Sequence, residues 1–270
     1  MPQRDDRVVE ERWLSWCGHP DHEPTQAALR AAFREGLGAD RLLERLAGNQ
    51  TTPWTDAASA LAIDVLRHDL GGPEEAHRCL VDLVRKQALE PLHAARLAQG
   101  ALDPQRAVLV WEEIAQQTAQ PVERATLYAD ISTLYEETLG QPGPAIEAAL
   151  VSFMAHEVDG VPFRRLVAHY EARTRWRDVL GLYDVLLHGR DPAGPAGDDH
   201  RALLLVEKAR VEEERMQAPD RAARTLLEAL HLQPGNAALL SLLRDRVAPR
   251  IADDDLRAFV VHRCHALVQA

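Results

Sequence analysis

Small residues at a regular spacing restrict the fold of this sequence more than any other feature. Ala145, Val179 and Ala222 are separated by 34 and 43 residues, and the longer interval contains a Gly/Pro-rich insertion. Each begins the same pattern: a small or bulky residue stands four positions later, and a small or aliphatic residue stands seven positions later. This spacing follows one face of a helix. A period near 34 residues is typical of stacked helical hairpins, so we expect an all-α solenoid.

The turns before these helices also repeat. Pro stands near the start of the next helix and Ala follows, because Pro is pre-organised for a first helical turn. Four turns have this form, at residues 71–76, 102–107, 139–145 and 218–222. They add Ala76 and Ala107 to the series of small marker residues, at intervals of 31 and 38 residues that indicate degenerate repeats in the first half.

Composition supports helices over sheets. Hydrophobic residues make up 46% of the chain but aromatic residues only 5%, so Ala, Leu and Val must fill the core. Small side chains suit closely packed helices, whereas strands favour β-branched and aromatic residues.

Residues 123–157 resemble the tetratricopeptide repeat family, through the sequence LYEETLG at 134–140 and the alanine-rich stretch at 145–150. Residues 161–188 and 203–234 match the same pattern. The resemblance is strong over 123–236 and loose elsewhere, and Glu212 stands where the family usually has Tyr. It implies an α-α superhelix, a right-handed solenoid of antiparallel helix pairs.

We expect four parts along the chain. Residues 1–24 form an N-terminal capping helix and loop, and residues 25–188 form degenerate and TPR-like helix pairs. Residues 189–200 are a flexible Gly/Pro-rich segment, either an exposed loop or a hinge. Residues 201–270 form a TPR-like helix pair and C-terminal capping helices.

Charge and hydropathy exclude several classes of partner. The net charge is −11, from 31 basic and 42 acidic residues, and no basic stripe is visible, so we expect no nucleic-acid binding.

The first ten residues lack the apolar core of a signal peptide and no apolar run is long enough to cross a bilayer. Three dispersed cysteines indicate free thiols. We therefore expect a cytoplasmic protein without membrane insertion. Nearly all of its basic residues are Arg rather than Lys, which indicates a GC-rich, bacterial genome.

Two clusters contain residues of the kind that bind metals. Cys17, His19 and His22 lie together near the N-terminus, and His262 and His265 share one face of the last predicted helix. A closed zinc site needs four ligands, and neither cluster supplies them. A polar loop and a surface pair are the preferred interpretations, with metal binding as the alternative, and we expect no cofactor.

The chain contains no nucleophile elbow, phosphate-binding glycine loop or metalloprotease helix motif. Adjacent acidic residues such as Glu112 and Glu113 point about 100° apart on a helix rather than toward one substrate. We therefore expect that the protein is not an enzyme.

The family resemblance also implies where a partner would bind. In such repeats the first helix of each pair lines the concave face, which would carry three triplets that end in Glu. A partner peptide or helix with basic residues would complement these carboxylates, unless the glutamates are simply solvated. The residues predicted to contact the partner are Thr133, Glu136, Arg164, Glu171, Arg210 and Glu213.

The sequence thus favours a non-catalytic protein–protein interaction scaffold that holds a partner in its groove. The alternative is a regulatory or sensor subunit whose groove binds a peptide or small ligand and changes the superhelix conformation.

Limited proteolysis tests the segment assignment. The first cut should fall between Gly189 and His200, because exposed backbone is cleaved before packed helices. The fragments would be identified by mass spectrometry, and a first cut within 123–187 would contradict the assignment.

Overall fold

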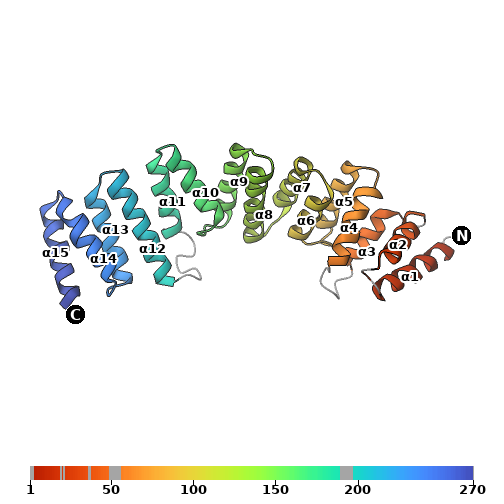
Figure 1. The fold of residues 1–270 in the computed structure, drawn as a ribbon, viewed down its shortest axis with the longest axis horizontal. Helices are drawn as coiled ribbons and strands as arrows, with labels where there is room; N and C mark the ends of the chain where they lie inside the picture. Colours follow the sequence, from red (N-terminus) through yellow and green to blue (C-terminus); the bar gives the residue numbers. More distant parts are fainter. Residues whose placement is uncertain are drawn as a thin grey trace. The chain divides into compact units, whose positions relative to one another are not determined.

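The computed structural model describes residues 3–18, 20, 22–35, 38–48, 56–188 and 197–269. All regular elements in these ranges are helices, which confirms the all-α prediction (Figure 1). The helices form two compact units, Met1–His156 and Glu157–Ala270.

The first unit consists of short helices joined by tight turns. In chain order they are α1 (Gln3–Gly18), α2 (Glu23–Glu35), α3 (Ala39–Gly48), α4 (Asp56–His68), α5 (Pro73–Arg85), α6 (Pro91–Ala101), α7 (Pro104–Gln117), α8 (Pro121–Thr133), the π-helix η1 (Leu134–Thr138) and α9 (Pro142–Ala155). The pairs α4–α5, α6–α7 and α8–α9 pack as hairpins. The first helices also pack on each other, α4 on α6 and α6 on α8.

The second unit continues the alternation. It contains α10 (Val161–Ala172), α11 (Trp176–His188), α12 (Gly197–Arg210), the π-helix η2 (Val211–Arg215), α13 (Pro219–Leu232), α14 (Ala237–Ser241), the π-helix η3 (Leu242–Val247), the 3₁₀ turn η4 (Ala248–Arg250) and α15 (Asp254–Gln269). Helices α10–α11 and α12–α13 are the hairpins, and α13 also packs against η3, η4 and α15.

The small marker residues lie where the sequence predicts. All five are buried in second helices: Ala76, Ala107, Ala145, Val179 and Ala222. At the α8–α9 contact, the buried Ser132 hydroxyl donates to the Ala145 carbonyl at 2.7 Å, and the Ser152 hydroxyl donates to the Ala125 carbonyl at 2.7 Å. Each hydroxyl is thus satisfied by the backbone of the facing helix, which requires close approach of the two backbones.

The turn after a first helix is built in the same way in two hairpins. Leu139 N–H donates to the Leu134 carbonyl at 3.1 Å, and Met216 N–H donates to the Val211 carbonyl at 3.1 Å. The following residue has a positive φ in both turns, 63° at Gly140 and 51° at Gln217. These turns are 77 residues apart, as are Ala145 and Ala222, so backbone and sequence repeat together.

The structure differs from the expected extent of the segment 189–200, and it shows the surroundings of Glu212, which departs from the repeat pattern. The helix α12 begins at Gly197, so the last four residues of the segment 189–200 are helical, while residues 189–196 lie outside the described ranges. Glu212, at the position where the resemblance expects Tyr, is buried against α13. Its carboxylate accepts from the Thr225 hydroxyl at 2.7 Å and pairs with Arg221 at 3.4 Å.

Replacing Ala145 or Ala222 by Leu should lower the free energy of unfolding by about 1–3 kcal/mol, because three extra carbons must enter a filled contact. Chemical denaturation measures the loss. The same change at the exposed Ala258 in α15 is the control and should leave stability nearly unchanged. Parental stability in both core variants would show that the marker positions are not tight helix contacts.

Candidate interaction surface

In the first unit, the predicted partner-facing residues occupy the end of α8. Thr133 is half-buried, and its hydroxyl donates to the Ala129 carbonyl at 3.2 Å, while Glu136 in η1 is exposed. Asp130 lies one turn earlier and was not predicted. Burial raises the pKa of Asp130, and the positive charge of Arg96 on α6 opposes this shift. Helices α6 and α8 therefore carry side chains of opposite charge, Arg96 and Asp130.

In the second unit, Arg164 links the first helices α10 and α12. Its guanidinium donates to Asp159 at 2.7 and 2.6 Å and to Glu207 on α12 at 2.7 Å. The Tyr183 hydroxyl on α11 donates to the same Glu207 carboxylate at 3.1 Å. The hydrogen bonds to Asp159 and Glu207 raise the pKa of Arg164, so its charge is permanent and compensated within the chain.

The Arg164–Glu207 pair fixes the register of the two helices. Residues one turn toward the N-terminus on each helix are Val161 and Leu203, and both are strongly exposed, at 61% and 52%. One turn toward the C-terminus lie Ala168 and Arg210, which are also exposed. We call these residues, together with Glu171, the α10–α12 face.

The α10–α12 face is therefore layered along the helix axis. It has an aliphatic row at one end, a self-compensated ion pair next to it, and charged side chains at the other end. Arg210 lies 3.6 Å from Glu214, a separation too long for a hydrogen bond. Glu171 supplies an exposed carboxylate one turn after Ala168.

Glu213 does not lie on this face, which corrects the prediction for that residue. Its side chain is only 3% exposed and accepts from Arg246 at 3.1 Å and Arg250 at 2.7 Å. Arg246 and Arg250 from the η3–η4 segment cover Glu213, whereas its counterpart Glu136, 77 residues earlier in η1, stays exposed. Glu213 is thus an internal connection between η2 and the segment η3–η4.

The two clusters of potential metal ligands have ordinary surroundings in the described part of the chain. Cys17 and His22 are exposed, and the His22 ring nitrogen Nδ1 lies 2.8 Å from the Thr25 hydroxyl, while His19 is outside the described residues. His262 and His265 are exposed on α15, as predicted. Among the described residues, no three His, Cys, Asp or Glu side chains gather as metal ligands. No described helix is long and apolar enough to cross a membrane.

Val161 and Leu203 were missed by sequence reasoning. Their one sequence signal is an aliphatic residue in the first or second turn of a first helix, outside the set that a helical wheel assigns to the core. Exposure of such a residue is decided by neighbouring helices, which periodicity does not describe.

Comparison with protein-family models and with curated proteins gives no match to this chain. Function is therefore argued from the geometry of these faces.

Glu213→Gln should lower the free energy of unfolding by about 1–3 kcal/mol, because a neutral amide replaces the carboxylate that two arginines share. Thermal and chemical denaturation measure the effect. Glu214→Gln is the matched control: Glu214 also pairs with Arg246 but is far more exposed, so its loss should be smaller. Equal losses would contradict the buried role of Glu213.

Proposed function

We propose that this protein is a non-catalytic protein–protein interaction scaffold. Its hairpins stack as a TPR-like, right-handed solenoid, and the faces of its first helices bind a peptide or helix of a partner protein. The α10–α12 face is the proposed contact surface of the second unit, and Thr133 and Glu136 belong to the proposed contact surface of the first unit. This role needs no cofactor.

The exposed aliphatic row is the observation that carries the proposal. Scattered exposed apolar residues are common, but Val161 and Leu203 occupy matching places on neighbouring helices whose register is fixed by the Arg164–Glu207 pair. The adjoining Arg164–Glu207 ion pair joins the two helices beside this row. An apolar row beside charged residues is the arrangement that binds an amphipathic segment.

The layering also defines the partner. Its apolar side chains would cover Val161 and Leu203, and a basic side chain at the other end would pair with Glu171. Apolar contact supplies most of the binding free energy, whereas the exposed carboxylate mainly accelerates association.

Affinity capture from an extract of the native cell, with quantitative mass spectrometry, tests this function. The double variant Val161→Asp, Leu203→Asp should reduce the recovered partner by about tenfold or more, because it places two charges in the apolar row. Leu109→Asp is the control, since Leu109 is similarly exposed at 54% but lies on the second helix α7. Equal recovery with both variants would refute binding at the α10–α12 face.

With the captured partner in purified form, Glu171→Lys should slow association and leave dissociation nearly unchanged. Stopped-flow kinetics at two salt concentrations resolve the effect, which should shrink at high salt. An unchanged association rate would exclude a basic group of the partner near Glu171.

A further inference from the structure

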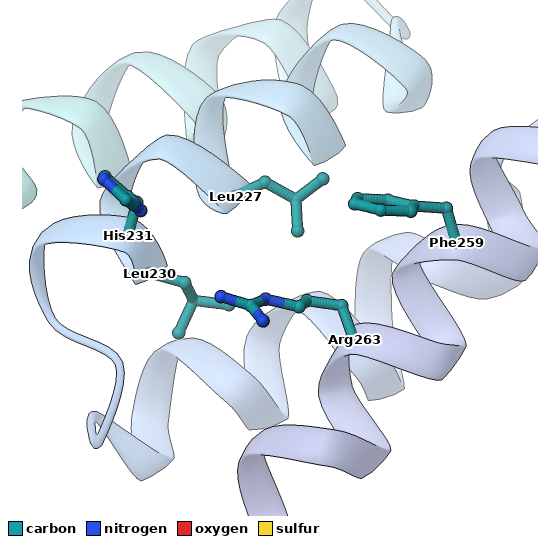
Figure 2. Close-up of a pocket in the computed structure, with 5 residues that line it drawn as sticks. All are labelled: Leu227, Leu230, His231, Phe259 and Arg263. Carbon is teal, nitrogen blue, oxygen red and sulfur yellow. The ribbon is translucent and has the colours of Figure 1, made fainter.

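A cleft of about 240 Å³ lies between α13 and α15, and none of its lining residues belongs to the α10–α12 face (Figure 2). Leu227 from α13 and Phe259 from α15 point toward each other, and the Arg263 side chain extends from α15 toward Leu230. His231 completes the lining. The cleft thus combines an apolar floor with two basic side chains.

The corresponding groove in the first unit has a different chemistry. Between the second helices α5 and α7, basic side chains face carboxylates: Arg106 pairs with Glu74 at 2.6 Å and His77 with Glu113 at 2.7 Å. The α13–α15 cleft has no carboxylate among its lining residues. Its complement is therefore a surface that carries a bulky apolar side chain next to an acidic one.

The N-terminal helix α1 has such a surface. Its inner face buries Val9, Trp13 and Trp16, and the opposite side carries Leu14 with Glu11 one turn before it. Leu14 is 63% exposed, the highest fraction of any large apolar side chain in the described part of the chain.

Helix α1 exposes Leu14 and Val8, and α15 exposes Phe259 and Val261. The exposed Leu14 thus has the acidic Glu11 one turn away, and the exposed Phe259 has the basic Arg263 one turn away.

We propose that copies of this chain associate head to tail, with α1 of one copy docked in the α13–α15 cleft of the next. Leu14 packs against Leu227 and Phe259, and Glu11 lies beside Arg263. Such an interface joins two different surfaces, so each copy keeps one free α1 and one free cleft, and association continues unless the assembly closes into a ring.

Sedimentation velocity of the full chain over a range of concentrations tests the proposal. The parent should exceed the 30.0 kDa mass of one copy as concentration rises. Leu14→Asp and Phe259→Asp should each weaken self-association by about thirtyfold or more, because each places a charge in the apolar contact. Circular dichroism should show parental helix content in both, since both side chains are exposed.

A mixture of the two variants gives the decisive test of head-to-tail association. Leu14→Asp keeps an intact cleft and Phe259→Asp keeps an intact α1, so an equimolar mixture should form pairs of about twice the monomer mass and nothing larger. Leu109→Asp should associate like the parent. A mixture that stays monomeric, or a parent that stays monomeric at every concentration, would overturn the proposal. None of these variants changes Val161 or Leu203, so the result is separate from the test of the α10–α12 face.

Discussion

Close approach of helix backbones at small residues is the constraint on which the hairpins depend. Ala145 and Ala222 leave room for a first helix to lie directly against the second. The hydroxyl groups of Ser132 and Ser152 then reach carbonyls on the facing helix, which satisfies their polar groups without water. A chain with few aromatic residues can fill such contacts because the gaps between its helices are small.

Polar contacts specify how one element is placed against the next. Arg164 joins α10 to α12, and Glu213 joins η2 to the η3–η4 segment. In the first unit, the Tyr135 hydroxyl donates to Glu112 at 2.7 Å and connects η1 to α7. Burial and this hydrogen bond raise the pKa of Tyr135 to about 12, so the phenol remains a donor at physiological pH. These pairs link elements that periodic apolar contacts alone would leave free to slide.

Periodicity predicts the parts of the fold that it encodes. The helical class and the burial of Ala76, Ala107, Ala145, Val179 and Ala222 follow from spacing alone, because a small residue at a helix crossing recurs with every repeat. The burial of Glu213 does not follow, since it depends on arginines more than thirty residues away. Val161 and Leu203 escape prediction for a related reason: the same aliphatic side chain is buried or exposed according to which helix lies beside it.

The π-helical turns η1 and η2 separate the surface of a first helix from the turn that follows it. Each adds a residue to a helical turn without changing the closing bonds to the next helix, so the side chains after it are rotated about the axis while the hairpin stays intact. A gain or loss of one residue there would change which side chains of that turn face the solvent. Repeats of this kind can therefore acquire new surfaces through changes in length at one fixed point, and not only through substitution.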